Sequence, residues 1–434
     1  MTKLFHLFIV LILFNSCSFN ENSKFWTNSK KVAEDKNLEF QEIFPKEESL
    51  KKEFNSSLNL EFTSKISDNT DINNFLNNNG RLNFDGNLKK KSSYKFSKIE
   101  NFHQYQPEIS FNNDSIIFFD KKGSIFKFNS KSRLIWKKNY YSKYEKKLNP
   151  ILQFINNEKN LIVTDNIANY YMLNIETGNL IWSKNNLAPF NSQIKIYENK
   201  FFVIDLSNTL RCFSLENGEE LWNVKTENSL IRTQKKLSMV IIDNNVYFIN
   251  SLGDISAVDI ENGELIWQLP TQSSLLYEGS FSLENSDIIS DGKSLFFSTN
   301  NNQFFSIDFK TGTFNWENKI NSNLRSTIIG DYIVSISLEG YLIILEKKSG
   351  KIIRVTDIFQ NFKKKKRDQI KPIGFIVGLD KIYLSLSNGR LMIIDVQSGK
   401  TISTKKIDNE KISKPFVQNK NLFLIKENAI IRMN

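Results

Sequence analysis

A short turn motif recurs along the chain with nearly the same composition each time. It reads NIETGNLIW from Asn174, SLENGEELW from Ser214, DIENGELIW from Asp259 and DFKTGTFNW from Asp308. In each copy a tryptophan stands four residues after a glycine. Recurrence at a near-constant spacing indicates that the chain is built from copies of one structural unit, so that unit must be identified before any single residue is interpreted.

The turn position occurs seven times, and the first and last copies are separated by 267 residues in six intervals, or about 45 residues per repeat. The turn residues are Ser132, Gly178, Gly218, Gly263, Gly312, Gly350 and Gly399. The position four residues later holds Trp136, Trp182, Trp222, Trp267, Trp316, Arg354 and Ser403. Because five of the six tryptophans in the chain occupy one repeat position, we expect these indoles to share one structural role.

Each copy is predicted to form short β-strands. Runs such as VYFIN, DISAVDI and ELIWQL alternate apolar and polar residues and are rich in aromatic and β-branched side chains, which is typical of half-buried strands. Four such strands in about 45 residues are typical of one blade of a β-propeller. The indole supplies more apolar surface than one small sheet buries by itself, so we expect each tryptophan to dock against the next blade.

The two ends of the repeat region complement each other. The tail from Lys414 to Asn434 contains three strands and stops before a fourth, while SYKFSKI (93–99) matches the fourth strand alone, with Tyr94 in the tryptophan position. The sequence therefore predicts an all-β fold over residues 92–434, an eight-bladed β-propeller of four-stranded blades whose last blade is closed by the N-terminal strand. Closure of this kind removes exposed sheet edges.

The start of the chain has the features of an export signal. An apolar run from Leu4 to Phe14 follows Lys3, and its eleven residues are too few to span a bilayer, which needs roughly 20. Ser16-Cys17 then resembles the processing site of bacterial lipoproteins. We predict a signal peptide over residues 1–16, an acylated Cys17, and a polar tether over residues 17–91; secretion without lipid is the alternative.

Charge and cysteine content narrow the function classes. The formal net charge is +11, but no segment combines basic residues with the groove-reading pattern of a nucleic-acid binder, so no nucleic-acid partner is predicted. The basic run Lys363–Arg367 is either a solvated loop or an attractor of anionic lipid or acidic partners. Besides Cys17 the chain has only Cys212, for which a small buried apolar role is predicted.

The turn motif resembles the repeat of pyrroloquinoline-quinone-type propellers, Asp-x-x-Thr-Gly followed by a tryptophan, with NIETGNLIW and DFKTGTFNW as the nearest copies. One class with this repeat consists of quinone-dependent dehydrogenases, which resemble one another in a calcium site, an aspartate base and commonly a vicinal cysteine pair. Here no cysteines are adjacent, and the only histidines are His6 and His103. No catalytic residue, metal ligand or cofactor is therefore predicted, and a dehydrogenase remains an alternative.

The layout as a whole resembles the BamB family of outer-membrane lipoproteins: a lipidation site, a polar tether and eight blades of this repeat. The resemblance implies a non-catalytic scaffold in the machinery that assembles outer-membrane β-barrel proteins. It would be lipid-anchored to the outer membrane of a Gram-negative bacterium and face the periplasm. The implied state is a monomer within a hetero-complex, bound to the periplasmic domains of a BamA-like barrel.

The same resemblance implies where the partner binds. The connections that follow the tryptophan strands are long and variable, and they should all emerge on one face of the ring; they are residues 139–150, 225–237, 269–283 and 357–372. By resemblance, Leu230, Ile231 and Arg232 in one of these connections and Glu284 after the next are the partner-binding residues. The alternative is a periplasmic propeller that binds a small ligand or a cell-wall component.

Overall fold

The computed structural model describes residues 50–71, 73–99, 107–226, 233, 235–271 and 283–434. The chain divides into two compact units, Met1–Glu47 and Glu48–Asn434, and only the second lies within the described residues. Cys17 and the predicted signal peptide therefore lie outside them. No helix among the described residues is long and apolar enough to cross a membrane.

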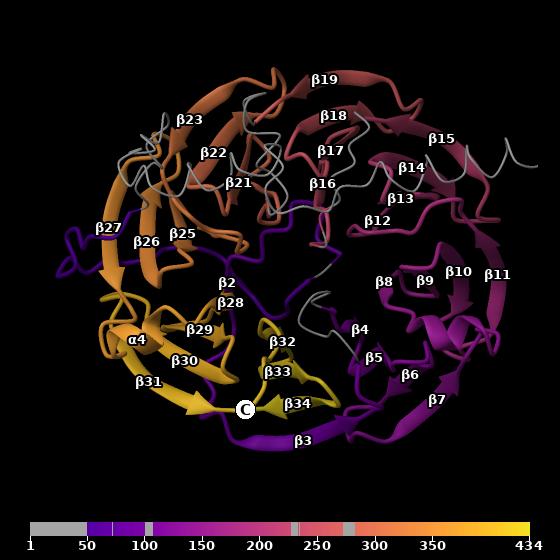
Figure 1. Ribbon diagram of the computed structural model, residues 1–434, viewed down its shortest axis with the longest axis horizontal. Coiled ribbons are helices and arrows are strands. Elements are labelled where there is room, and N and C mark those ends of the chain that lie inside the picture. The colour runs from indigo at the N-terminus through magenta and orange to yellow at the C-terminus, as the bar shows by residue number, and fades with distance from the viewer. Residues whose placement is uncertain (1–49, 72, 100–106, 227–232, 234, 272–282) are drawn as a thin grey trace, which may run out of the picture. The chain divides into compact units, whose positions relative to one another are not determined.

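The second unit is a ring of eight four-stranded antiparallel sheets (Figure 1). The first four blades follow each other along the chain. Blade 1 contains β4 (Ser110–Asn112), β5 (Ser115–Phe119), β6 (Ile125–Phe128) and β7 (Leu134–Lys138); blade 2 contains β8 (Leu152–Asn156), β9 (Asn160–Asp165), β10 (Asn169–Asn174) and β11 (Leu180–Asn185); blade 3 contains β12 (Lys195–Tyr197), β13 (Lys200–Ile204), β14 (Thr209–Ser214) and β15 (Glu220–Lys225); blade 4 contains β16 (Met239–Ile242), β17 (Asn245–Ile249), β18 (Ile255–Asp259) and β19 (Leu265–Leu269).

The remaining blades complete the circle. Blade 5 contains β20 (Ile289–Ser290), β21 (Ser294–Thr299), β22 (Gln303–Asp308) and β23 (Phe314–Asn318); blade 6 contains β24 (Thr327–Ile329), β25 (Tyr332–Ile336), β26 (Tyr341–Glu346) and β27 (Ile352–Asp357); blade 7 contains β28 (Pro372–Val377), β29 (Lys381–Leu386), β30 (Arg390–Asp395) and β31 (Thr401–Lys406); blade 8 contains β32 (Phe416–Gln418), β33 (Asn421–Lys426), β34 (Ala429–Met433) and, from the other end of the propeller, β3 (Lys90–Lys95). Two short helices lie in connections, the 3-10 helix η1 (Glu145–Leu148) and α4 (Lys364–Arg367).

The ring closes as the sequence predicted. Strand β3 pairs antiparallel with β34, and Tyr94 lies opposite Ile430. The Tyr94 ring is 1% exposed and packs edge-on against Phe128 of blade 1, with the ring centroids 5.6 Å apart. The prediction of an all-β, eight-bladed propeller whose last blade is completed by the N-terminal strand is confirmed.

The core consists of the layers between adjacent blades. Each middle strand is apolar on both faces, so that side chains from neighbouring sheets meet in shared clusters; Tyr247 of blade 4 and Phe305 of blade 5 belong to one of them. Full burial of one large apolar side chain contributes about 1.5–3 kcal/mol to folding. Because each sheet is buried only by its neighbours, the blades depend on the integrity of the ring.

A tryptophan and a glycine join each of five blades to the next. The indole Nε1–H donates to a backbone carbonyl of the following blade at 3.0–3.2 Å, in the pairs Trp136–Ile175, Trp182–Leu215, Trp222–Ile260, Trp267–Phe309 and Trp316–Lys347. The turn glycine of that following blade lies against the indole face. At Gly263, φ is +75° and a Cβ would stand 2.8 Å from Trp222, so both backbone conformation and space require glycine.

Arg354 replaces the indole in blade 6. Its guanidinium is fully buried and donates to the carbonyls of Val396 (3.4 Å) and Gln397 in blade 7 and of Leu58 (2.9 Å). Burial lowers the pKa of Arg354 to about 10. The Arg354 guanidinium thus makes the hydrogen bond between blades that the indole makes elsewhere. It also binds the N-terminal segment through the Leu58 carbonyl.

Residues 50–89 differ from the predicted tether. Phe54 exchanges backbone hydrogen bonds with Val355 on the outer strand of blade 6, and Leu60 and Phe62 are buried. The short strands β1 (Ile66–Ser67) and β2 (Arg81–Leu82) then pair in parallel, and β2 joins the inner edge of β28 in blade 7. This part of the predicted tether 17–91 is therefore packed on the propeller, because its polar side chains and backbone bond to strand edges.

Candidate functional site

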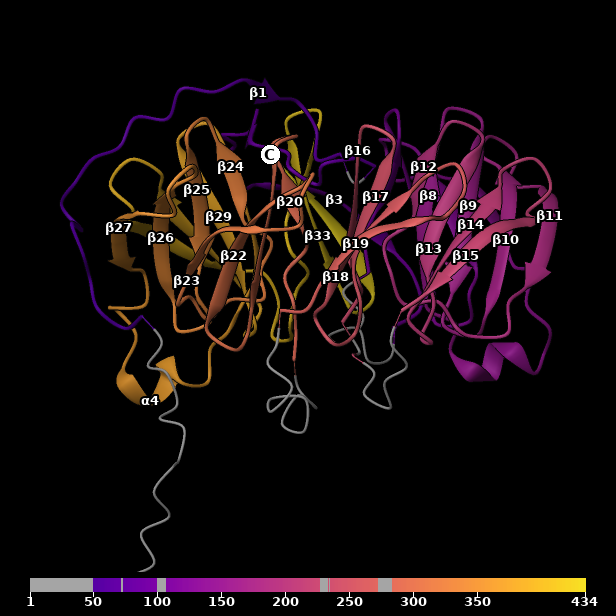
Figure 2. The ribbon, with the colours of Figure 1, turned by 90° about the horizontal axis from the view of Figure 1, so that it is seen from above.

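The connections from the outer strand of one blade to the inner strand of the next emerge on one side of the ring, which we call the loop face. Helices η1 and α4 lie in two of these connections, and both stand on the side opposite β1 (Figure 2). Loops on a rigid scaffold are the usual place for binding residues, because they vary without disturbing the core. The loop face is therefore the first candidate site.

The predicted partner-binding residues are only partly described. Leu230, Ile231 and Arg232 lie outside the described residues. Glu284 is half-buried, and its carboxylate accepts a hydrogen bond from Asn323 Nδ2 of the blade 5–blade 6 connection. Its backbone also pairs with Asn300, at 2.9 and 3.1 Å. Glu284 thus has a structural role in holding two connections together.

Three apolar side chains on the loop face did not stand out in the sequence. Tyr144 is 71% exposed and Leu148 is 44% exposed in the connection between blades 1 and 2, and Leu187 is fully exposed in the connection between blades 2 and 3. They sit on consecutive connections, next to the one that contains 230–232. The only sequence sign of this surface is Leu187, an isolated leucine in the polar stretch NNLAP. It is weak evidence for a binding surface, because single exposed apolar residues are common.

The basic run divides into two parts. Arg367 is part of the fold, because its Nη1 bonds to Asp357 at 2.6 Å and its guanidinium lies 5.2 Å from the Tyr341 ring centroid. Lys363, Lys364, Lys365 and Lys366 are exposed on and beside α4. Four exposed ammonium groups on one helical turn give the loop face a local positive potential.

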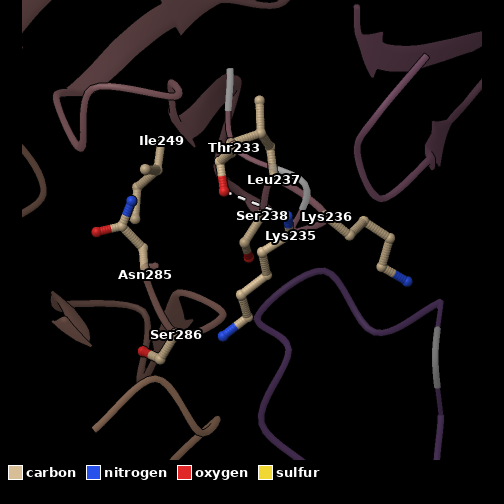
Figure 3. Close-up of a pocket in the computed structure, with 8 residues that line it drawn as sticks. All are labelled: Thr233, Lys235, Lys236, Leu237, Ser238, Ile249, Asn285 and Ser286. Carbon is tan, nitrogen blue, oxygen red and sulfur yellow. Dashed lines mark hydrogen bonds between the residues drawn. The ribbon is translucent and has the colours of Figure 1, made fainter. Parts of the chain in front are cut away.

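A small pocket lies between blades 4 and 5 at the channel rim (Figure 3). Its lining includes Lys235, Lys236, Ser238 and Ser286, and the backbone N–H of Lys235 donates to Thr233 Oγ1 at 3.2 Å. The two lysine side chains point in different directions, Lys235 toward Ser286 and Lys236 away from it (Figure 3). The cavity volume of this pocket is about 10 Å³, room for about one water molecule, which is far below the usual range for organic ligands.

Each blade brings one equivalent position, at or just before its inner strand, to the central channel. This position lies four residues before the residue that opens the first hairpin and is in register with the residue three positions further on, for example Lys414 before Gln418, which pairs with Asn421, and Arg325 before Ile329, which pairs with Tyr332. We call the resulting set the channel ring; it consists of Glu108, Gln153, Gln193, Ser238, Asp287, Arg325, Gly374 and Lys414. Seven of these eight residues are polar or charged, which is unlike the adjacent apolar core.

Charges in the channel interact strongly. The Glu108 carboxylate binds Lys236 at 2.5 Å and also Lys414, and these side chains are 11–16% exposed. Burial acts to raise the pKa of Glu108, but the two lysines outweigh it and hold that pKa well below its usual range. Burial lowers the pKa of Lys235 to about 8 and that of Lys195 to about 7.

The N-terminal segment 70–82, which we call the plug segment, crosses the channel on the side opposite the loop face (Figures 1 and 2). Among the described residues it bonds to inner strands of seven of the eight blades. These contacts are Asn73–Asn156, Asn77–Gln193, Phe75–Ile241, Leu76–Ser290, Asn78–Ile328, Arg81–Val377 and Thr70–Val417, in blades 2 to 8. The plug segment therefore occupies the strand edges that would otherwise face the channel.

Asn77 is the centre of the plug segment. Its side chain is 3% exposed, and Nδ2 donates to the carbonyls of Met239 and Ile288, each at 2.9 Å. Its Oδ1 accepts from Lys195 Nζ at 2.6 Å, and φ at Asn77 is +57°. Asparagine suits this position because its amide both donates and accepts and because it tolerates the left-handed conformation.

We searched the described residues for side chains that could bind a metal ion or act as a nucleophile. No group of three or more histidine, cysteine, aspartate or glutamate side chains in the described ranges is placed to hold a metal ion. Cys212 is buried on β14, and burial raises the pKa of its thiol to about 12, which suits the packing role predicted for it.

Comparisons with known proteins agree with the geometry. The family model described as outer membrane protein assembly factor BamB matches residues 121–356, slightly more than half of the chain. No curated protein matches. Among solved structures, BamB from Moraxella catarrhalis has a TM-score of 0.64 at 16% identity, covering 80% of this chain and 100% of that one. Quinohemoprotein alcohol dehydrogenase from Comamonas testosteroni has a TM-score of 0.62 at 9% identity, covering 81% and 78%.

Proposed function

The chain belongs to the family of the outer membrane protein assembly factor BamB, and from this premise we propose that it is a non-catalytic scaffold subunit of the machinery that assembles outer-membrane β-barrel proteins. In this proposal residues 1–16 are removed, Cys17 carries the lipid that anchors the protein to the outer membrane, and the propeller faces the periplasm. The loop face binds the periplasmic domains of a BamA-like barrel.

The observation that carries the proposal is the set of exposed apolar side chains on adjacent loop-face connections. Tyr144, Leu148 and Leu187 project from two connections of a rigid ring, and the next connection contains Leu230–Arg232. Apolar and aromatic anchors surrounded by polar loops are the usual composition of a protein–protein interface. In the proposal these residues supply the apolar contact and Arg232 pairs with a carboxylate of the partner.

The exposed lysines of α4 support the same orientation. Lys363–Lys366 lie on the loop face, and a positive patch there attracts acidic surfaces at a range of about 10 Å at 0.1 M salt. The likeness to quinohemoprotein alcohol dehydrogenase, at 9% identity, concerns the fold and assigns no activity to this chain.

The test is co-purification from detergent-solubilised outer membranes. The tagged full-length protein should carry a BamA-like barrel with it, identified by mass spectrometry. Leu187→Asp and Arg232→Glu should each reduce the amount of barrel by at least about tenfold, which corresponds to about 1.4 kcal/mol. Leu221→Asp is the matched control, because Leu221 is 49% exposed on β15, away from the loop face.

Two results would contradict the proposal at different levels. If the wild-type protein carries no barrel, or carries only peptidoglycan fragments or a small molecule, the assembly function is wrong. If the barrel is present but Leu187→Asp and Leu221→Asp reduce it equally, the function stands and the loop face is not the binding surface.

A further inference from the structure

We propose that the central channel, between the plug segment and the loop face, binds a small oxyanion that carries two or more negative charges. Its phosphate or carboxylate oxygens would be held by the basic residues of the channel ring and their neighbours. Nothing in the family match or in the fold comparison assigns a ligand to this place, and the proposal does not depend on the assembly function.

The first argument is the balance of charge. The channel level just beyond the plug segment contains five basic side chains and two carboxylates, and the charge of Asp71 in the plug segment also acts on Lys195, so that basic groups outnumber carboxylates by two. The cations are Lys195, Lys235, Lys236, Arg325 and Lys414, and the carboxylates are Glu108 and Asp287. Adding the neighbouring pair Glu284 and Lys411 leaves the excess unchanged. Buried charge is normally compensated, so an excess of this size in a narrow channel favours anionic ligands.

The second argument is the supply of donors. Lys195 is 1% exposed, and its Nζ donates to two neutral oxygens, the Asn74 carbonyl at 2.5 Å and Asn77 Oδ1 at 2.6 Å. Arg325 lies near enough to the Asp287 carboxylate for its charge to lower the pKa of that carboxyl, but among the described residues its five N–H groups donate no hydrogen bond to a carboxylate or carbonyl. Glu108 is shared between two lysines, so each of them retains donor capacity.

The third argument concerns the electrostatic state of the lysines. Burial and the nearby Arg325 together lower the pKa of Lys195 to about 7, against the attraction of Asp71, Glu108 and Asp287. Burial also lowers the pKa of Lys414, against the attraction of Glu108. An anion among these groups would stabilise their charged forms and relieve their mutual repulsion, which supports the geometric argument.

The occupant is a small ion, because the ring side chains Lys236, Glu108 and Lys414 are only 11–16% exposed to solvent. Arginine binds two oxygens of one carboxylate or phosphate at once, and lysines bind further oxygens as point charges. A diphosphate or a tricarboxylate has the charge and the oxygen spacing to meet cations that converge from several blades.

The experiment is isothermal titration calorimetry on the full-length protein in detergent at constant ionic strength, with inorganic pyrophosphate in one arm and citrate in the other. We expect saturable binding of one anion per chain with a dissociation constant below about 1 mM, and a rise in the thermal midpoint. Binding of pyrophosphate alone indicates phosphate chemistry, binding of citrate alone indicates carboxylate chemistry, and either outcome supports the site.

Variants locate the binding. Arg325→Gln and Lys414→Gln should each weaken it by at least about tenfold, while Arg325→Lys should weaken it less. Lys365→Gln on α4 is the matched control, because it removes one exposed positive charge far from the ring. If neither anion binds up to about 10 mM, or if Lys365→Gln weakens binding as much as the ring variants, the proposal is wrong. Two independent ring positions keep the test valid if one variant does not fold.

Discussion

Replacement of Gly263 by alanine should destabilise the propeller more than the same change at Gly292. Both glycines have positive φ, +75° and +84°. A Cβ at Gly263 would stand 2.8 Å from Cδ2 and Cε3 of Trp222, whereas a Cβ at Gly292 would meet no atom within 4 Å. The two positions therefore share the backbone cost and differ in the clash with the indole.

The magnitudes follow from these two contributions. An alanine in the left-handed region costs roughly 1–2 kcal/mol at either position. Overpacking against the Trp222 ring adds about 1–3 kcal/mol at Gly263 alone, because the indole is also held by its bond to the Ile260 carbonyl at 3.0 Å. We expect a free energy of unfolding reduced by about 2–5 kcal/mol for Gly263→Ala and by about 1–2 kcal/mol for Gly292→Ala.

The assay is equilibrium urea unfolding of both purified variants, followed by circular dichroism, with the slope compared to show that the same surface is exposed. A double-mutant cycle isolates the contact: with Trp222→Leu as background, the cost of Gly263→Ala should fall to that of Gly292→Ala. If the two alanine variants lose the same stability in the wild-type background, or if Trp222→Leu leaves the difference unchanged, the tryptophan–glycine contact does not join the blades.

Two further predictions concern the plug segment. Asn77→Ala should reduce the free energy of unfolding by about 3 kcal/mol or more, because it removes one of the two acceptors of Lys195 Nζ and takes the Asn77 donor from two buried carbonyls. Asn55→Ala, at an exposed position that also has positive φ, should cost less than about 1 kcal/mol, and equal losses in urea unfolding would contradict the role given to Asn77. Stability should also rise with pH between about 7 and 10, because the pKa of Lys195 is lowered to about 7 in the folded protein, so that the unfolded chain binds more protons in that window. The rise is at most about 1.4 kcal/mol per pH unit for this group. Urea midpoints at pH values of about 7, 8 and 9 should rise less steeply in Lys195→Met, and Lys235, whose pKa is lowered to about 8, should keep part of the rise. A wild-type midpoint that falls over the same range would contradict the assigned pKa direction.

The repeat, the blade number and the closing strand could be predicted because they depend on local patterns. The alternation along each strand and the recurring turn glycines can be read directly from the sequence. Tyr94 could be placed in the tryptophan position because its strand matches the fourth strand of the repeat. The pairing of Tyr94 with Ile430 then followed from counting blades.

The plug segment could not be predicted from the same patterns. DNTDINNFLNNNG lacks alternation, and its composition is that of a solvated linker. Its partners lie between 83 residues away in the sequence, for Asn73 and Asn156, and 347 residues away, for Thr70 and Val417. The role of Arg354 was hidden for the same reason, since its acceptors are carbonyls of Leu58 and Gln397, which no local window contains.

The plug segment explains why an asparagine-rich stretch is suited to the centre of a propeller. Blades are wedge-shaped, so each inner strand has one edge without a neighbouring strand, and backbone N–H and C=O groups on that edge need partners. A single short segment cannot run as a strand along all of these edges, because they point toward the axis from different directions. Asparagine side chains solve this problem with single donor and acceptor groups, as when Asn77 reaches the carbonyls of blades 4 and 5 and the ammonium of blade 3. Glycine or serine at this position would leave some of these carbonyl and ammonium groups without a hydrogen-bond partner. The segment therefore needs amide side chains, and sufficient length alone would not allow it to cross the channel.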